Sequence, residues 1–363
     1  MIKTFDYLTT LAEYEAEILD AVRRVLHSGR LILGPETEAF EAEFAEFVGS
    51  KYCIGVTSGT MALHLALFAL GIGHGDEVVT VANTCVPTIS GLRLSGARLR
   101  LVDVRDDNLM MDLSQIPPVV TSRTKCVVPV HLWGQAVDLE VLTSFCAETG
   151  LLMVEDCAQA HGTGYRGRHV GNFGTMGCFS FYPTKNLGAY GEAGAVVTND
   201  EEQAAKLREM RMYGYDEDRV SVREGMNARI SEMQAAILRV KLRRLPGVLK
   251  RRREIAEMYD EGLDHPDIAL PARQPDVERS LHQYVIRCAR REDLIAVLDA
   301  ESIGYGIHYP VPPHAMPAYR QLAADSGPLP VTERASREIL SLPMHEALSD
   351  EEVARVIDAV NSL

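Results

Sequence analysis

Short apolar stretches recur along the first two hundred residues and alternate with segments of helical periodicity. Between residues 12 and 28, and again between 35 and 48, apolar positions recur every three to four residues before a glycine, which predicts two amphipathic helices. The later apolar stretches predict strands over residues 54–57, 77–82, 98–104, 125–132, 151–156, 178–183 and 194–199. Many of these strands are apolar on both faces, so the pattern predicts an α/β sandwich around a largely parallel sheet.

The pattern changes after about residue 200. Residues 201–214 and 230–263 are long, charged segments with helical periodicity. The C-terminal part then predicts a strand, a helix, a proline-rich loop and two amphipathic helices. We therefore expect a large domain over residues 12–245 and a smaller C-terminal α/β domain over residues 246–363, which also includes residues 1–11.

Charge and cysteine content exclude several classes of protein. The 363 residues include 37 Lys and Arg against 51 Asp and Glu, and this net charge of −14 argues against binding to nucleic acid or anionic lipid. The seven cysteines are scattered, with no CxxC pair and no cluster at zinc spacing, so we expect no metal site and a reducing cytoplasm. No apolar stretch has membrane-spanning length, and the acidic N-terminus lacks a signal-peptide core, so no membrane association is expected.

Three small residues mark a candidate anion site. Ser58, Gly59 and Thr60 lie where a predicted strand ends and a predicted helix begins. Unpaired N–H groups and the dipole at a helix N-terminus attract phosphate, and glycine lets a ligand approach the backbone closely. The same residues also fit an ordinary helix cap.

Two carboxylates end the predicted strand in LLMVEDCAQAHG, and the second of them is Asp156. Ligands of open α/β sheets bind outside the carboxyl ends of the strands. An acid there could be a metal ligand, a base, the partner of a heterocyclic nitrogen or a helix cap. A magnesium site would need additional carboxylates, and the neighbouring sequence offers none.

Lys185 follows an apolar stretch, precedes several glycines and has no charged neighbour before Glu192. A lysine withdrawn from water has a lowered pKa and can form a Schiff base with an aldehyde. Ser180 adds a hydroxyl for a phosphate. One ligand explains the whole set: pyridoxal 5′-phosphate (PLP), with its phosphate at Ser58–Thr60 and Ser180, its ring nitrogen at Asp156 and its aldehyde at Lys185.

These motifs resemble those of the DegT/StrS-type sugar-nucleotide aminotransferases, which are PLP enzymes of the aspartate-aminotransferase fold, fold type I. The resemblance covers nearly the whole chain, and its motifs keep the family order: SGRLILGPETEAFEAEFAEFVG, SGTMALHLAL, GHGDEVVT, VEDCAQAHG, FSFYPTKNLGAYGEAGAVVTND, GMNARISEMQAA, HYPVPPH and LSLPMH. It implies that Lys185 is the Schiff-base lysine and proton carrier, and that Asp156 is the partner of the pyridine nitrogen.

The resemblance also implies further contacts to the cofactor. Gln159 takes the place that approaches the ring and its 3-hydroxyl, while Ser180, Gly59 and Thr60 match the phosphate cradle. Asn227 matches an asparagine that reaches the phosphate of the neighbouring subunit, which implies a homodimer with shared active sites. Arg229 is expected at the same seam.

Cys85 departs from the family pattern. The family usually has an aromatic residue at this position, where it stacks on the cofactor ring. A thiol cannot stack in that way, although sulfur can contact a ring face. We therefore expect Cys85 beside the cofactor as a small packing residue, with a redox or catalytic role as the alternative.

The resemblance implies a ping-pong transamination from L-glutamate to a nucleotide-linked keto-sugar, with dTDP or UDP as the nucleotide and C3 favoured over C4. His308, Tyr309 and His314 would line the sugar end of the site, unless their loop is only structural, and Tyr182 would touch the substrate or simply pack. Alternatives are a 4-keto-sugar aminotransferase, a keto-inositol aminotransferase and a non-catalytic PLP-binding regulator. Sugar 3-dehydratases of the family have histidine in place of Lys185, which disfavours that activity.

Overall fold

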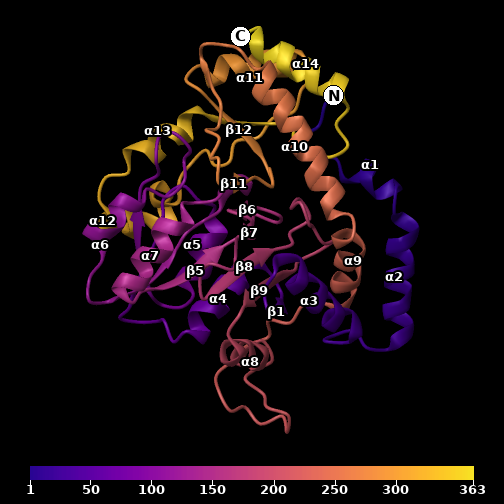
Figure 1. Ribbon diagram of the computed structural model, residues 1–363, viewed down its shortest axis with the longest axis vertical. Helices are drawn as coiled ribbons and strands as arrows, with labels where there is room; N and C mark the ends of the chain where they lie inside the picture. The colour runs from indigo at the N-terminus through magenta and orange to yellow at the C-terminus, as the bar shows by residue number, and fades with distance from the viewer.

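A seven-stranded sheet lies at the centre of the protein, and helices cover both of its faces (Figure 1). The computed structural model describes all 363 residues. The strand order is β1-β9-β8-β5-β4-β2-β3, and β9 alone is antiparallel to its neighbours. The bounds are Tyr52–Val56 (β1), Glu77–Val81 (β2), Arg98–Val102 (β3), Thr124–Val128 (β4), Leu152–Asp156 (β5), Met176–Ser180 (β8) and Gly194–Thr198 (β9). The predicted α/β architecture with a largely parallel sheet is confirmed.

Adjacent residues of a strand contribute to different hydrophobic cores, because side chains alternate between the two faces of a sheet. Val78 of β2 packs in the core formed with α4 and α5, whereas Val79 packs in the core formed with α3 and α7. The helices of these two layers and their neighbours are Pro35–Val48 (α3), Gly59–Ala69 (α4), Val86–Arg93 (α5), Ile116–Val119 (α6), Leu139–Thr149 (α7) and Glu201–Met210 (α8). None of the helices combines the length and the apolar character needed to cross a bilayer.

One predicted helix is divided in the structure, and one helix was not predicted. Glu15–Ser28 (α2) corresponds to the helix expected over 12–28, and the short helix Tyr7–Ala12 (α1) precedes it. The segment 230–263 forms Glu232–Leu242 (α9) and Leu245–Gly262 (α10), and the break falls just before Pro246. Proline is tolerated in the first turn of a helix but not in its interior, which explains why a new helix begins there.

A second sheet lies in the C-terminal part of the chain and has the antiparallel order β10-β12-β13. It shares a core with α10, α11 and α14, and Ile2 near the N-terminus joins that core. The remaining elements are Gly164–Tyr165 (β6), Arg168–His169 (β7), Ile268–Ala269 (β10), Val277–Glu278 (β11), Tyr284–Cys288 (β12), Ile339–Leu342 (β13), Arg291–Ala300 (α11), Arg320–Ser326 (α12), Pro330–Glu338 (α13) and Asp350–Asn361 (α14). The predicted boundary at residue 245 falls at the start of α10, and the division into two domains stays a prediction.

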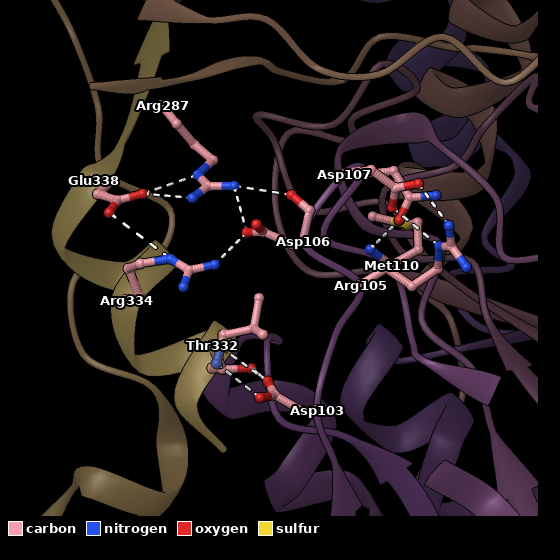
Figure 2. Close-up of polar contacts among 11 residues, drawn as sticks. Asp103, Arg105, Asp106, Asp107, Met110, Arg287, Thr332, Arg334 and Glu338 are labelled. Carbon is pink, nitrogen blue, oxygen red and sulfur yellow. Dashed lines mark hydrogen bonds and ion pairs between the residues drawn. The ribbon is translucent and has the colours of Figure 1, made fainter. Parts of the chain in front are cut away.

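Polar contacts fasten the C-terminal part to the loop that follows β3 (Figure 2). The buried carboxylate of Asp103 accepts hydrogen bonds from the N–H groups of Val331 and Thr332, both at 2.8 Å, and so caps the N-terminus of α13. Asp106 pairs with Arg334 of α13 and with Arg287 of β12, which lies 2.8 Å away. These contacts fix α13 and β12 against the central sheet.

Candidate active site

A cavity of about 410 Å³ lies where the parallel strands end. Residues at or just after the carboxyl ends of β1, β2, β5 and β8 line it, as expected for a ligand site in an open α/β sheet. The lining includes most of the residues predicted from the sequence: Ser58, Gly59, Thr60, Cys85, Asp156, Gln159, Ser180, Tyr182, Lys185, His308 and Tyr309. The fold therefore gathers residues from Ser58 to Tyr309, which lie far apart in the chain.

The N-terminus of α4 forms one wall of this cavity. Ser58 is the N-cap, and its Oγ accepts a hydrogen bond of 3.2 Å from the N–H of Met61. A Cβ added at Gly59 would lie only 2.6 Å from the Cβ of Ser180. Any larger residue at position 59 would therefore clash with Ser180. Helix cap and anion cradle are thus compatible, because Ser58 uses one N–H and leaves the other first-turn donors for a ligand.

Asp156 lies buried at the end of β5. Its Oδ2 accepts a hydrogen bond of 2.8 Å from the hydroxyl of Thr88, and its Oδ1 accepts one of 3.1 Å from the N–H of Ala158. Burial raises the pKa of this carboxyl above its usual value, although the hydrogen bond from Thr88 opposes the shift. No Lys or Arg side chain forms an ion pair with Asp156, so the cavity offers a place for a cationic group beside it.

Lys185 lines the same cavity. Burial lowers the pKa of its ammonium group, and the nearby acidic groups of Cys85 and Asp156 offset only part of this shift. A lysine with a lowered pKa holds more of its amine in the neutral, nucleophilic form near neutral pH.

Gln159 is held at both ends of its amide. Its Oε1 accepts a hydrogen bond of 2.8 Å from the N–H of Trp133, and its Nε2 donates one of 2.9 Å to the hydroxyl of Tyr309. Cys85, the one cysteine that is not fully buried, lies 3.6 Å from the hydroxyl of Thr88 through its Sγ. The position that carries an aromatic ring in the family therefore presents a thiol to the cavity.

Glu155, the neighbour of Asp156, faces away from the cavity. Its two oxygens accept hydrogen bonds from His131 at 3.0 Å and from the N–H groups of Gly171, Phe173 and Gly174, each at 2.8 Å. His131, Glu155 and Cys157 each bring a potential metal-ligand atom within 4.8 Å of the others. The four N–H donors already saturate the carboxylate, so this cluster holds a loop rather than offering oxygen ligands to a cation.

Three predicted site residues lie outside the cavity. Arg229 donates from Nε to Oδ1 of Asn227 at 3.0 Å and stacks over the ring of Tyr213. His314 is buried in a short 3₁₀ helix, with its Nε2 3.5 Å from Glu333. Within one chain, neither pair reaches the cavity that contains Lys185, so the roles expected for Asn227, Arg229 and His314 stay predictions.

The cavity also contains residues that the sequence did not single out, including Thr88, Thr184, Glu192, His282 and Gln283. Thr88 could have been found as a hydroxyl in the first turn of a helix that follows a strand end. His282 and Gln283 precede β12 in the C-terminal part, and no local pattern links that segment to Lys185.

Comparisons with known proteins identify the family to which this sequence is similar. Residues 12–361 match the model of the DegT/DnrJ/EryC1/StrS aminotransferase family. The chain is 47% identical over 362 residues to the dTDP-3-amino-3,4,6-trideoxy-alpha-D-glucose transaminase of Micromonospora megalomicea subsp. nigra, covering 97% of each. It is 42% identical over 361 residues to the dTDP-3-amino-3,6-dideoxy-alpha-D-galactopyranose transaminase of Aneurinibacillus thermoaerophilus, covering 99% of each.

The fold agrees with that of a solved structure as well. The crystal structure of S. venezuelae DesV in complex with a ketimine intermediate superposes with a TM-score of 0.96 at 42% identity. The match covers 99% of this chain and 98% of that chain. The predicted aminotransferase fold is therefore confirmed over the whole length of the protein.

Proposed function

Because the chain belongs to the DegT/DnrJ/EryC1/StrS aminotransferase family, we propose that it transfers an amino group from L-glutamate, through PLP, to C3 of a dTDP-linked keto-deoxysugar. One observation carries this proposal: a half-buried lysine, a buried aspartate without a cationic partner and an open helix N-terminus line a single cavity. The two relatives described above, both named as transaminases for dTDP-linked 3-amino sugars, support the choice of sugar nucleotide and of C3.

The residues fit the chemical groups of PLP one by one. The phosphate would bind at the N-terminus of α4 and the hydroxyl of Ser180, which glycine at position 59 allows to lie close to that N-terminus. A protonated ring nitrogen would pair with Asp156, and this positive charge would offset the effect of burial on the carboxylate. Lys185 would hold the aldehyde carbon through its amine. When bound, PLP supplies an electron-withdrawing ring that stabilises negative charge on the carbon that loses a proton.

The side chains of this protein then move and hold protons. Nζ of Lys185 accepts the proton that leaves the α-carbon of glutamate in the first half-reaction, and it delivers a proton to C3 of the sugar in the second. Its lowered pKa suits both tasks, because the amine can be neutral before it accepts the proton. Thr88 holds the Oδ2 atom of Asp156, and Trp133 and Tyr309 hold the amide of Gln159 in one orientation at the cavity wall.

The proposal includes a homodimer in the cytoplasm. Large apolar side chains are exposed on and just after α2, at Leu19, Leu26, Leu31 and Ile32, and a second set is exposed at Tyr213, Val220 and Val222. Exposed apolar groups in such numbers are typical of a surface that another protein covers. A second copy of the chain on these surfaces would allow Asn227 to reach the phosphate site of its partner.

Absorption spectroscopy tests the proposed function directly. The purified protein mixed with PLP should show a yellow absorption band, and L-glutamate should bleach it. Lys185→Ala should lose this conversion, whereas Lys125→Ala, on the surface of the sheet, should retain it. A band that no amino donor bleaches would favour a PLP-binding regulator. A bleached band with transfer to a keto-inositol or a 4-keto sugar, and not to a 3-keto sugar, would contradict the proposed substrate.

A further inference from the structure

A smaller cavity of about 180 Å³ adjoins the candidate active site. This cavity, which we name the side pocket, shares its wall with the larger one through Thr184, His282, Gln283 and His308. Polar pockets that open into a reaction site commonly orient part of the substrate. The chemistry of the side pocket therefore indicates which substrate group it takes.

His282 presents a hydrogen-bond acceptor to the side pocket. Asn186 donates from Nδ2 to the carbonyl oxygen of Ser280 at 2.8 Å, which fixes its amide so that Oδ1 faces Nδ1 of His282 at 3.3 Å. Nδ1 must therefore carry the ring hydrogen, and Nε2 is left with a free lone pair. No protein group bonds to Nε2, and this atom is open to the cavities that the residue lines.

Two further groups in the wall lack partners. Oε1 of Gln283 is buried and accepts no hydrogen bond. His308 bonds through Nδ1 to the hydroxyl of Ser341 at 2.8 Å, and no protein group bonds to its Nε2. A buried acceptor without a donor, such as Oε1 of Gln283, is unfavourable, so this wall favours a ligand that brings hydrogen-bond donors.

The charges in the wall exclude an anionic ligand group. Burial and the charge of Lys185 lower the pKa of His308 to about 4, and the same causes lower that of His282, so both rings are neutral near pH 7. The buried guanidinium of Arg252 donates to the carbonyl oxygens of Leu281 and Met344 and to Glu346, which neutralises its charge. A neutral, acceptor-rich pocket favours hydroxyl groups over the carboxylates of glutamate.

We propose that the side pocket binds hydroxyl groups of the sugar ring, one of which donates to Nε2 of His282 and another to Oε1 of Gln283. This inference rests on the proposed function, because it assumes that a keto sugar is the amino acceptor. It makes His282 and Gln283 determinants of sugar specificity that act in the second half-reaction and not in the first. A sugar that lacks the hydroxyl bound by His282 binds more weakly, because it cannot donate a hydrogen bond to Nε2.

Calorimetric titration of the full-length enzyme loaded with pyridoxamine 5′-phosphate tests the proposal. The two ligands are dTDP and the product named for a relative, dTDP-3-amino-3,6-dideoxy-α-D-galactose. In His282→Asn the amide nitrogen takes the place of Nδ1 and preserves the bond to Asn186, but nothing replaces Nε2. Loss of one hydrogen bond should weaken binding of the amino-sugar nucleotide about five- to tenfold, while the Kd for dTDP stays within about twofold.

Gln283→Met provides a second variant of similar volume, and it should weaken the amino-sugar nucleotide about fivefold. Its matched control is Gln274→Met, since Oε1 of Gln274 is also buried without a partner but lies in a different cavity. The control should bind both ligands like the wild type. The rate at which glutamate bleaches the PLP band should stay within about twofold of the wild-type rate in all three variants.

Three results would overturn the proposal. Equal weakening of dTDP and the amino-sugar nucleotide would show a general structural defect. A slower glutamate half-reaction would show that His282 acts on Lys185, and a raised KM for glutamate alone would assign the side pocket to the amino donor. Failure of the proposed function looks different, because the wild type would then bind the amino-sugar nucleotide no better than dTDP and would aminate no keto sugar.

Discussion

The end of β5 separates two regions that use neighbouring carboxylates in opposite ways. Behind the strand, Glu155 accepts four hydrogen bonds from His131 and from the loop that contains Gly171, Phe173 and Gly174. On the other side of the strand, the carboxylate of Asp156 accepts two hydrogen bonds and faces the cavity. Both are buried. A saturated buried carboxylate stabilises the fold, whereas an unsaturated one reserves its charge for a ligand, so the number of protein donors distinguishes structure from function.

The largest effect is expected on the cavity side of the strand, from Asp156→Asn. The amide cannot stabilise a positive ring nitrogen, so the rate of glutamate conversion should fall about 10³-fold. The unfolding temperature of the apoprotein should not fall, because the N–H of Ala158 can still donate to Oδ1 and the hydroxyl of Thr88 can accept from the new amide nitrogen. Stopped-flow absorbance and differential scanning calorimetry measure the two quantities. An apoprotein that unfolds at a much lower temperature would show that Asp156 also stabilises the fold, as Glu155 does.

Glu155→Gln should produce the reverse result. One oxygen becomes an amide group that faces N–H donors, which leaves buried donors without partners. The free energy of unfolding should fall by about 3 kcal/mol, as judged by urea titration. The folded fraction should still bind PLP and react with glutamate at a rate within about tenfold of wild type. A fully folded but inactive variant would instead assign Glu155 to the chemistry.

The pH dependence of apoprotein stability should have opposite signs for the two carboxylates. Burial alone would raise the pKa of Glu155, but hydrogen bonds from His131, Gly171 and Gly174 outweigh it and lower the pKa below 4.5. Its contribution to stability is present above pH 4.5 and is lost as the pH falls. The pKa of Asp156 is raised above 3.8, so its ionisation opposes folding as the pH rises through that raised value.

Urea titrations from pH 3 to pH 7 check this prediction. Relative to wild type, Asp156→Asn should gain stability with rising pH, and Glu155→Gln should lose its acid-sensitive contribution. Parallel curves for the two variants would contradict the assignment of opposite shifts.

A smaller effect is expected from Thr88→Val. This change removes the hydroxyl that donates to Oδ2 of Asp156 while keeping the shape of the side chain. The affinity for PLP should fall about tenfold, because a charge-assisted hydrogen bond is lost, and the pH at which the bound cofactor titrates should shift. Fluorescence titration and a spectral pH series measure these changes. Thr84→Val, one hydrogen bond further from the carboxylate, is the matched control and should be milder.

The smallest effect is expected at a third, exposed carboxylate. Asp106 lies 60% exposed and pairs with Arg287 and Arg334 on the C-terminal part (Figure 2). Exposed pairs contribute little, so Asp106→Asn should lower the free energy of unfolding by less than about 1 kcal/mol, and less still in high salt. Asp103→Asn, in the buried cap of α13, should be clearly more harmful. Equal losses in the free energy of unfolding for the two variants would show that exposure does not decide how much Asp103 and Asp106 contribute to stability.

The part of the cavity proposed to hold the cofactor could be predicted because its residues occur in short motifs at strand ends. Ser58, Asp156 and Lys185 each follow an apolar stretch, and the carboxyl ends of parallel strands meet at one edge of a sheet. The substrate side was predicted less completely. His308 and Tyr309 line the cavity as expected, but His314 lies outside it and His282 was missed. These residues come from the C-terminal part, whose placement depends on contacts that no local pattern reveals.

The sequence by itself determined the strand and helix order and the sheet type, and it singled out the lysine that lines the cavity, because periodicity and local motifs depend on neighbours along the chain. Tertiary structure alone decided that Thr88 holds Asp156, that Glu155 is closed by the loop 171–174 and that His282 faces the side pocket. Hydrogen-bond saturation depends on donors far away in sequence, and packing of the whole chain is required to bring them together.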